Sequence, residues 1–520
     1  MDASDRIAAG SHFRLAELMA AISLATDLGM GQPMEQTLRT CLIAVGLGAR
    51  IGLGPQELSD VYYVALLRYL GCTADAYETA KLVGGDDIGF RAAVAPVYGA
   101  AFGDFMRGVV PRLGQGQAPQ RRLAIMAGFM ARGSAITRQG ITAHCEVGES
   151  LARRIGLGEG VRRGLAHAFE GWNGHGFPAG LAGDQVAVSA RIVTLARDAE
   201  VLASAFGPNE AVSLIRHRRT AGTYEPALVD TFVAHGRELL ELVEGSSVWE
   251  VVLAAEPQPH PWVPAARLDA VLEAFADFAD LKSPYTIGHS RGVADLAGRA
   301  ATGDRRQQLR RAALLHDLGR TSVPNAIWDW PGPLSQGQWE RVRLHPYYSE
   351  RILSRCPTLQ PLATLAGMHH ERLDGSGYHR SCQAPEIAVG ARILAAADAY
   401  QAMTQERPHR AAVTPHDAAR QLSEEAAAGR LDREAVHAIL LAAGHPPDRR
   451  FREWPADLTD REVEVLRLLC RGSSKKQVAA DLHISPSTAD HHVRHIYQKT
   501  GASTRAGAAI FALEHGLIPK

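Results

Sequence analysis

Histidine and aspartate residues gather in the middle third of the chain in a combination suited to metal chemistry. The candidate metal ligands are His289, His316, Asp317, His345, His369, His370 and Asp398. Imidazole and carboxylate groups without thiolates favour iron, manganese or another first-row divalent ion. Because the two oxygens of a carboxylate such as Asp317 can bridge two ions, we predict a pair of divalent metal ions here. Two ions about 4 Å apart activate water and clamp an in-line displacement at phosphorus.

The alternative is that these side chains have no shared role, because a single histidine is usually a buried or solvated structural residue. The two interpretations differ in what they require of the fold. The metal prediction needs the seven side chains to converge in space. It fails if His316, Asp317, His345, His370 and Asp398 lie too far apart to share ions.

The elements that must position these side chains are mostly helices. Apolar residues recur at three- and four-residue spacing, as in DAVLEAFADFADL at 269–281, which is typical of amphipathic helices. Two proline-rich stretches, 257–264 and 446–455, predict linkers, because proline breaks helices and stiffens connections. We therefore expect a mainly α-helical chain with domains at 1–250, 265–443 and 456–520.

Two of these domains share short sequence motifs and the intervals between them. HPYYSERIL, HHERLDGSGY and ARILAAADAY in the second match HCEVGESLA, AFEGWNGHGF and ARIVTLARDAE in the first. His144 precedes Asn173 by 29 positions, and His345 precedes Asp374 by the same interval. Shared intervals with shared local sequence predict an internal duplication.

The first copy lacks most of the metal-binding residue types. Arg68 and Tyr69 stand where the second copy has its adjacent His–Asp pair, and Ala168 and Phe169 stand where it has its adjacent histidines. We therefore expect no metal site in the first copy. A role in packing or regulation is predicted for it, with no ligand chosen.

The second copy resembles the HD-GYP domain, a metal-dependent phosphohydrolase that hydrolyses cyclic di-GMP. The resemblance covers about 282–412 and rests on GHS, AALLHDLGR, RLHPYYSERIL, HHERLDGSGY, ARILAAADAY and ERPHR, in the family's order. It implies that His316 and Asp317 are the HD pair, that the other five candidates are metal ligands, and that Asp317 and Arg320 are catalytic. Tyr285 stands where three-metal members have a glutamate, which favours two metals.

The same resemblance implies a set of substrate-binding residues. Arg320 replaces a lysine that contacts the scissile phosphate, and it keeps the positive charge with a different geometry. The residues implied to bind substrate are Arg320, Asp374, Gly375, Gly377, Tyr378, Arg407 and Arg410. His379 and His409 depart from the family pattern. The expected substrate is a cyclic dinucleotide or a related phosphate ester.

The last 64 residues predict four short helices, at about 459–471, 475–482, 488–500 and 505–515. Thr459 and Glu462 form a capping-box pattern at the first. The segment resembles the LuxR/FixJ-type helix-turn-helix domain along its whole length, which implies binding of double-stranded DNA. By position, Asp490, His491 and Arg494 would face base edges. The implied phosphate contacts are Lys475, Lys476, Ser487, Thr488 and Lys499.

Composition limits the remaining possibilities. Lys+Arg and Asp+Glu both number 56, which argues against a wholly basic nucleic-acid coat. The six cysteines are scattered without a C-x-x-C pair, which favours a reducing cytoplasm. No apolar run is long enough to span a membrane. A homodimer is expected from the helix-turn-helix resemblance alone.

These observations predict two tandem all-helical HD-type domains followed by a four-helix helix-turn-helix domain. One functional hypothesis is a bifunctional regulator, in which a metal-dependent phosphodiesterase of a cyclic dinucleotide shares a chain with a DNA-binding domain. The alternative is a LuxR-type transcription factor whose HD domains bind a nucleotide, or scaffold a dimer, without turnover.

Overall fold

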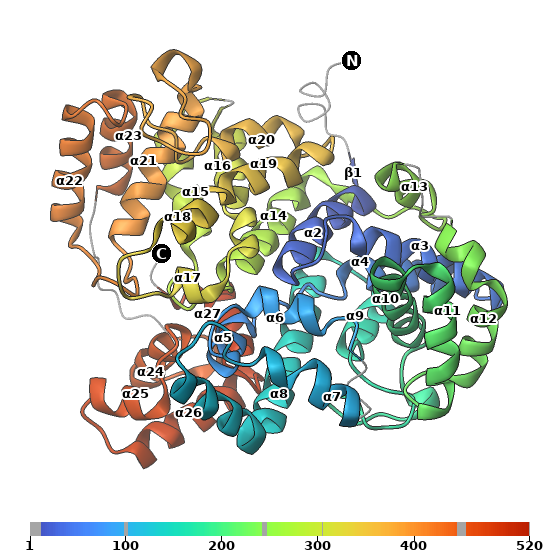
Figure 1. The fold of residues 1–520 in the computed structure, drawn as a ribbon. Helices are drawn as coiled ribbons and strands as arrows, with labels where there is room; N and C mark the ends of the chain where they lie inside the picture. Colours follow the sequence, from blue (N-terminus) through green and yellow to red (C-terminus); the bar gives the residue numbers. More distant parts are fainter. Residues whose placement is uncertain (1–11, 98–101, 242–246, 304, 445–453, 519–520) are drawn as a thin grey trace. The chain divides into compact units, whose positions relative to one another are not determined.

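The computed structural model describes residues 12–97, 102–241, 247–303, 305–444 and 454–518. Its regular elements are helices apart from one short two-stranded sheet (Figure 1), as the mainly α-helical prediction requires. The chain forms two compact units, Met1–Leu268 and Asp269–Lys520, called unit 1 and unit 2 below. The finer division into three domains stays a prediction.

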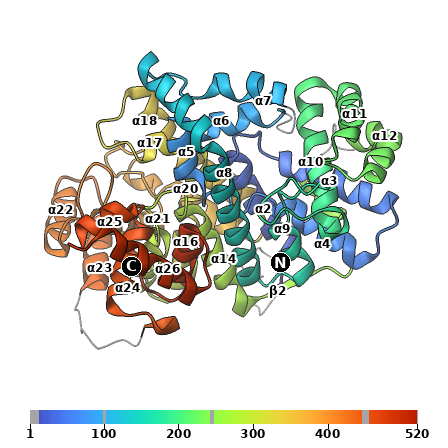
Figure 2. The same ribbon diagram turned by 90° about the horizontal axis from the view of Figure 1, so that it is seen from below.

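Unit 1 is a bundle of helices with one small sheet. Helices α3, α10, α11 and α12 lie side by side in both views of the ribbon (Figures 1 and 2), and α8 is a long helix of 37 residues. The elements of unit 1 are β1 (His12–Arg14), α2 (Leu15–Gly29), α3 (Gln36–Arg50), α4 (Pro55–Leu67), α5 (Ala76–Val83), α6 (Asp87–Val94), α7 (Phe102–Gly108), α8 (Pro119–Ile155), α9 (Glu159–Ala166), α10 (Val188–Phe206), α11 (Pro208–His217), α12 (Pro226–Glu241), α13 (Val248–Ala254) and β2 (Trp262–Pro264).

The first proline-rich stretch is more than a linker, which corrects the sequence interpretation. Its last residues form β2, which pairs antiparallel with β1 so that Phe13 lies opposite Val263. Both of these side chains are buried. Proline is compatible with an edge strand because it only removes one donor. The second proline-rich stretch falls largely at 445–453, outside the described residues.

Unit 2 begins within α14, whose apolar residues at helical spacing are buried as predicted, including Val271, Leu272, Phe275 and Phe278. The helices from this point are α14 (Ala265–Asp280), α15 (His289–Ala300), α16 (Arg305–Leu315), α17 (Asn325–Trp328), α18 (Gln336–Arg343), α19 (His345–Arg355), α20 (Gln360–Gly367), α21 (Val389–Met403), α22 (Pro415–Ala427), α23 (Arg433–Ala443), α24 (Asp460–Cys470), α25 (Lys475–Asp481), α26 (Pro486–Thr500) and α27 (Arg505–Glu514).

The same local structure occurs in both units. An isolated bridge joins Asn173 to Ala182 in unit 1, and another joins Asp374 to Gln383 in unit 2. In each loop a buried glutamate accepts hydrogen bonds from two backbone N–H groups. The repeated motifs therefore form the same turn twice.

The last four helices of unit 2 begin close to the predicted positions. Thr459 and Glu462 form the expected capping box of α24. Helix α26 begins at Pro486, two residues before the predicted start, because Ser485 caps it and proline is well suited to the first helical position. Ala489, Val493 and Ile496 form its buried face.

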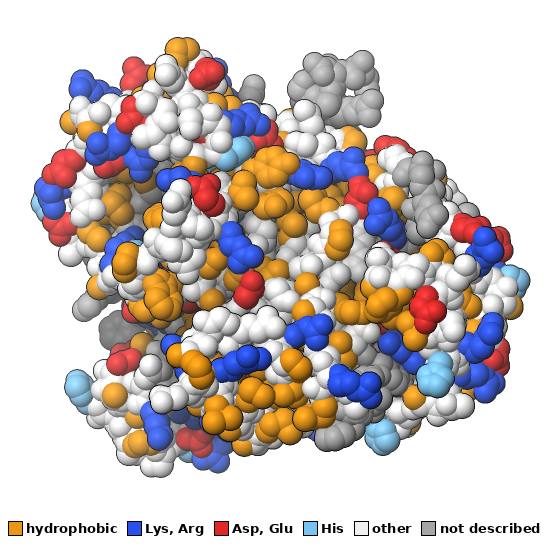
Figure 3. All heavy atoms as spheres, viewed as in Figure 1, with side chains coloured by type: hydrophobic (Ala, Val, Ile, Leu, Met, Phe, Trp, Pro, Cys, Tyr) orange, Lys and Arg blue, Asp and Glu red, His pale blue; other side chains and the backbone are white. Residues whose placement is uncertain are grey.

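The chain's surface and cysteines agree with its composition. Basic and acidic side chains are interspersed over the face shown in Figure 3, in line with a formal net charge of zero. All six cysteines are buried and free. Within the described residues, no helix combines the length and apolar character that a membrane span requires.

Candidate metal centre

Three of the predicted ligands occupy equivalent positions at helix ends. His316 follows α16, His345 follows α18, and His369 follows α20. The Nδ1 atom of each lies 2.6 Å from a backbone carbonyl oxygen three residues earlier, that of Ala313, Val342 or Ala366. A carbonyl oxygen can only accept, so Nδ1 donates and the lone pair of Nε2 is left for the centre.

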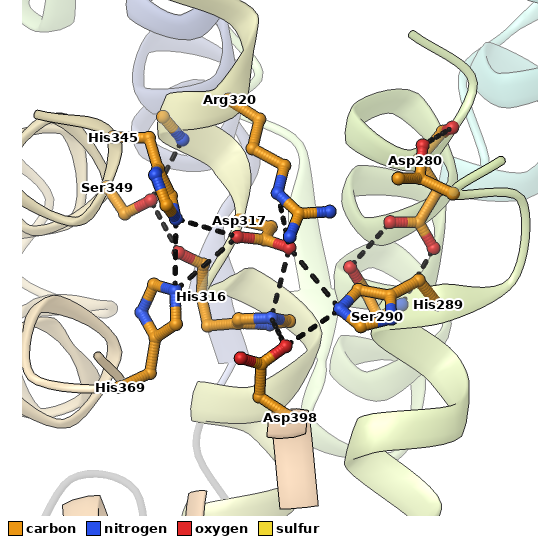
Figure 4. Close-up of polar contacts among 12 residues, drawn as sticks. Asp280, His289, Ser290, His316, Asp317, Arg320, His345, Ser349, His369 and Asp398 are labelled. Carbon is orange, nitrogen blue, oxygen red and sulfur yellow. Dashed lines mark hydrogen bonds and ion pairs between the residues drawn. The ribbon is translucent and has the colours of Figure 1, made fainter. Parts of the chain in front are cut away.

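Asp317 lies between two groups of imidazoles (Figure 4). Its Oδ2 is 3.1 Å from Nε2 of His316 and 3.6 Å from Nε2 of His289. Its Oδ1 is 3.4 Å from Nε2 of His345 and 3.5 Å from Nε2 of His369. The two carboxylate oxygens therefore face different sets of ligand atoms.

Asp398 and His370 complete the two groups. Oδ1 of Asp398 is 2.9 Å from Nε2 of His289 and 3.7 Å from Nε2 of His316. Its Oδ2 is 3.6 Å from Nδ1 of His370. The structure thus brings all seven predicted residues together, from helices and turns spread over more than a hundred residues.

The donor atoms fit a divalent cation. Nε2 of His316 and both oxygens of Asp317 are buried, and in the part of the chain that the structure describes none of them makes a hydrogen bond. Buried polar atoms normally have a hydrogen-bond partner, so these three atoms are suited to hold a cation. Three groups have ligand atoms within 4.8 Å of one another: His345, His369 and His370; His289, His316 and Asp398; and His316, Asp317 and His369.

The histidines of the centre differ in their pKa values. Burial lowers the pKa of His289 and of His345 to about 4, which keeps both rings neutral and able to ligate. Burial also opposes the charge of His316, but Asp317 and Asp398 raise its pKa to about 10, so a cation bound at Nε2 would displace a proton. Arg320 and the neighbouring histidines hold the pKa of Asp317 well below its usual range despite burial.

A second layer of polar residues orients the ligands. Nδ1 of His289 lies 2.9 Å from Oε1 of Gln405. Asp280, at the end of α14, accepts hydrogen bonds from the backbone N–H and the hydroxyl of Ser290 and so fixes the start of α15 (Figure 4). Sequence reasoning did not identify Gln405, because its contact with His289 joins segments that are distant along the chain. It also did not identify Asp280, although Ser290 is only ten residues away.

A cavity of about 620 Å³ opens beside the centre. His345, His370 and Tyr378 line it together with Arg320 and His409. Its lining also contains three tryptophans that the sequence analysis overlooked, Trp328, Trp330 and Trp339. Their signal was present, because three of the chain's seven tryptophans fall within twelve residues.

The predicted substrate-binding residues divide into two groups. Arg320 and Tyr378 reach the cavity, and Nε of Arg320 lies 2.9 Å from Oδ2 of Asp317. Arg410 donates to backbone carbonyl groups, among them that of Ala402, and Asp374 accepts from Ser376. The remaining members are Gly375 and Gly377 in the same turn as Asp374, and Arg407, which donates to the carbonyl oxygen of Tyr285.

The predicted DNA-binding residues lie on the exposed side of α25 and α26. Ser487, Thr488, His491 and Arg494 are exposed, as are Lys475 and Lys476. Asp490 pairs with Lys475, and it lies 3.2 Å from Arg494. Lys499 pairs with Glu462 at 2.7 Å. Part of the predicted basic surface is therefore already neutralised by acidic side chains.

Comparison with known families accounts for most of the chain. The HD domain model matches residues 115–243 and 273–435, together more than half of the sequence. Two separate matches confirm the predicted duplication. The model for bacterial regulatory proteins of the luxR family matches residues 456–512, in agreement with the second predicted resemblance.

Similar proteins include several phosphodiesterases. The chain is 34% identical over 444 residues to 3'3'-cGAMP-specific phosphodiesterase 3 of Vibrio cholerae serotype O1, covering 84% of this chain and 96% of that protein. It is 35% identical over 195 residues to a cyclic di-GMP phosphodiesterase of Thermotoga maritima, covering 36% of this chain and 52% of that protein. The crystal structure of a V. cholerae cyclic GMP-AMP specific phosphodiesterase superposes with a TM-score of 0.58 at 28% identity, covering 85% of this chain and all of that one.

Proposed function

This chain belongs to the HD domain family, and from that membership we propose that it hydrolyses a cyclic dinucleotide at the metal centre of unit 2 and binds double-stranded DNA through α25 and α26. HD domains are metal-dependent hydrolases, and the chain is accordingly an HD-type phosphodiesterase. The substrate, the number and identity of the ions and the DNA-binding role are the parts that we propose.

The observation that carries the proposal is the position of Asp317. Each of its oxygens faces a different group of imidazoles, which suits a carboxylate that bridges two ions. We propose two ions, iron or manganese. Bound divalent ions would lower the pKa of a water molecule and polarise the phosphoryl oxygens.

The chain's own groups would bind and orient the phosphate. Nη1 of Arg320 is buried, and within the described residues it makes no hydrogen bond. Arg320 can therefore donate to a phosphate oxygen and stabilise the charge that grows as the P–O bond breaks. Its guanidinium also lies over the ring of Trp328 at 4.9 Å, which holds its plane in place.

The tryptophan wall suits a nucleobase. Trp330 and Trp339 are 45% and 42% exposed, and large exposed indole rings beside a phosphate site offer stacking surfaces for bases. The relatives act, by their names, on 3'3'-cGAMP or cyclic di-GMP. We propose a cyclic dinucleotide of one of these two kinds.

The test is hydrolysis by the purified full-length chain with Mn²⁺ or Fe²⁺. Cyclic di-GMP and 3'3'-cGAMP should each be offered, and release of linear dinucleotide or mononucleotide followed by chromatography. Asp317→Asn is expected to lower the rate at least 100-fold, whereas Asp295→Asn, at an exposed ion pair with Arg299, should leave it unchanged. Absence of product from the metal-loaded wild type with both nucleotides would refute the proposal.

The DNA-binding proposal rests on the exposed face of α26. Ser487, His491, Arg494 and Gln498 succeed one another at helical spacing on this face, while Ala489, Val493 and Ile496 face the core. A recognition helix needs such a polar stripe to reach base edges. Selection from a random duplex library should enrich one motif with the wild type and not with Arg494→Ala. A palindromic motif would support binding as a homodimer.

One contact favours a second candidate function. Nε of Arg320 is 2.9 Å from Oδ2 of Asp317, so the guanidinium already neutralises the carboxylate that would bridge the ions. A chain that binds a nucleotide without turnover would keep this pair. In that case the metal-loaded protein would bind cyclic dinucleotide and release it unchanged, which the hydrolysis assay detects directly.

A further inference from the structure

Unit 1 contains a cavity of about 690 Å³ at the place that corresponds to the metal centre of unit 2. The correspondence follows from the repeated sequence: Arg68 stands at the position of His316, and Phe169 at that of His370. Arg197 stands six residues after Arg191, just as Asp398 stands six residues after Arg392. The volume lies within the range of small-molecule sites, roughly 300–1,000 Å³.

Arginine has replaced two metal ligands in this cavity. Arg68 and Arg197 both line it, so a fixed positive charge stands where unit 2 gathers the donor atoms for cations. A guanidinium needs no metal to attract an anion, and its planar set of donors matches phosphate oxygens. The cavity is therefore equipped for the same kind of ligand group without metal-assisted chemistry.

Arg68 is the less compensated of the two. It is only 7% exposed, and its Nη1 donates to the hydroxyl of Thr194 at 3.1 Å. Its guanidinium lies 5.0 Å from the ring centre of Phe169. Nε makes no hydrogen bond and no carboxylate lies within ion-pair distance, as judged over the described residues. An unpaired buried charge is costly, and an anionic ligand would relieve that cost.

The carboxylates of the cavity are engaged elsewhere. Oδ1 of Asp198 lies 2.6 Å from Nη1 of Arg197, and its Oδ2 accepts from the hydroxyl of Tyr224. Both oxygens of Glu170 accept backbone N–H groups, from Ala179 at 2.7 Å and Leu181 at 2.9 Å. None of these four oxygens is directed at Arg68.

We propose that this cavity binds a nucleotide and does not hydrolyse it, with a phosphate on Arg68 and the base against the aromatic rings. Phe169 and Phe177 both line the cavity, and aromatic faces stack on any base. The inference goes beyond the proposed activity of unit 2 and does not depend on it. Unit 1 would then be a ligand-binding domain built from a copy of the hydrolase fold.

The test is equilibrium dialysis on the full-length Asp317→Asn chain in EDTA, where turnover is prevented. The probes are GMP, cyclic di-GMP and 3'3'-cGAMP, with inorganic phosphate as a separate arm. At least one nucleotide is expected to bind saturably, and Arg68→Gln should weaken that binding tenfold or more. The matched change in unit 2, Arg320→Gln, should leave this class of sites intact.

A second pair of variants protects the test against misfolding of Arg68→Gln. His175 is exposed at the cavity, so His175→Glu places a carboxylate there without disturbing the core. Binding at low salt should weaken at least threefold, and His175→Gln should leave it unchanged. The proposal is overturned if no nucleotide saturates at millimolar concentration, if only inorganic phosphate binds, or if binding is equal in the wild type and both charge-changing variants. Failure of hydrolysis in the wild type would not affect this result.

Discussion

Asp317 connects the two halves of the candidate centre because a carboxylate has two oxygens and each faces its own set of imidazoles. The sequence predicted all seven members of the set, since residue type and order carry that information. The tryptophans that line the cavity were not predicted, although they cluster in the sequence. The contact of Gln405 with His289 was not predicted because it joins distant segments. Asp374 and Arg410, in contrast, make hydrogen bonds that stabilise local structure, and they do not line the cavity.

Substituting Trp330 tests the proposed base-stacking wall. Trp330→Ala should raise KM for the cyclic dinucleotide about tenfold with a smaller change in kcat, because stacking on one base is worth about 1–3 kcal/mol. Steady-state kinetics measures both constants. Trp262→Ala is the matched control, since Trp262 is also an exposed tryptophan and lies in the small sheet of unit 1. Equal effects of the two changes would contradict a substrate contact.

His144 predicts how unit 1 responds to acid. Burial lowers its pKa to about 4, despite a favourable charge on Asp75, and its Nε2 lies 2.9 Å from the carbonyl oxygen of Arg68. The unfolded chain binds the proton at about pH 6.5. The stability that the neutral ring contributes is therefore complete above pH 6.5 and is lost as the pH falls towards 4.

Chemical unfolding of unit 1 between pH 7 and pH 4 measures this loss, which should be on the order of 3 kcal/mol. His144→Gln should make the pH dependence flatter, because an amide can also donate to the carbonyl oxygen and does not titrate. His235→Gln, at an exposed histidine, should have no effect. Parallel curves for the wild type and His144→Gln would refute the assignment.

At the scale of elements, close backbone contacts fix the ligand-bearing helices. A Cβ on Gly319 would lie 2.0 Å from the carbonyl oxygen of His345, and one on Gly71 would lie equally close to that of His144. The Oγ atom of Ser349 accepts from the N–H of Gly319 and donates to the carbonyl oxygen of His316. The same contact in both units shows that the glycine serves packing, whether or not the metal ligands are present.

Gly319→Ala should therefore destabilise unit 2 by about 1–3 kcal/mol, the usual cost of overpacking, and should weaken metal binding. Thermal unfolding and metal content measure the two effects. Gly337→Ala is the control, because it lies in α18 with open space around its Cβ position. That change should be neutral or stabilising by up to about 1 kcal/mol. Full stability of Gly319→Ala would contradict the packing argument.

Helix α26 carries an acidic residue that lowers the positive charge of its exposed face. Asp490→Asn should free Lys475 and Arg494, so the affinity for duplex DNA should rise at least threefold. A plot of log affinity against log salt concentration should become steeper, by the amount that corresponds to about one or two more phosphate contacts. Asp481→Asn, on the exposed side of α25, is the control. An unchanged salt slope would show that these two cations do not reach phosphate.

The helices themselves were largely predictable from sequence. Capping residues located the start of α24, and the buried spacing of α14 followed the apolar pattern. The small sheet was missed because three residues per strand give too short a pattern, and the prolines beside β2 indicated a linker. What joins β1 to β2 is pairing between segments about 250 residues apart, which no local pattern encodes.

At the scale of the molecule, each unit contains an HD domain, and the two HD domains differ in the side chains at their centre. Added Mn²⁺ should stabilise unit 2 by about 3 kcal/mol at a hundred times its dissociation constant, and EDTA should reverse the effect. Hydrogen exchange would localise the change, with protection expected around 316–317, 345, 369–370 and 398. Unit 1 should show no change around His144. Protection that rises equally in both units would contradict a metal site confined to unit 2.

The carbonyl groups that accept from His316, His345 and His369 belong to the last turns of three helices. Each ring is thus anchored by the polypeptide before any ion arrives, and entry of an ion needs no refolding. The general order of affinity among first-row divalent ions is similar for any set of nitrogen and oxygen donors, so selection depends on the geometry of the site and on which metals are available. Enzyme made under different supplies of iron, manganese or zinc should therefore differ in its metal content.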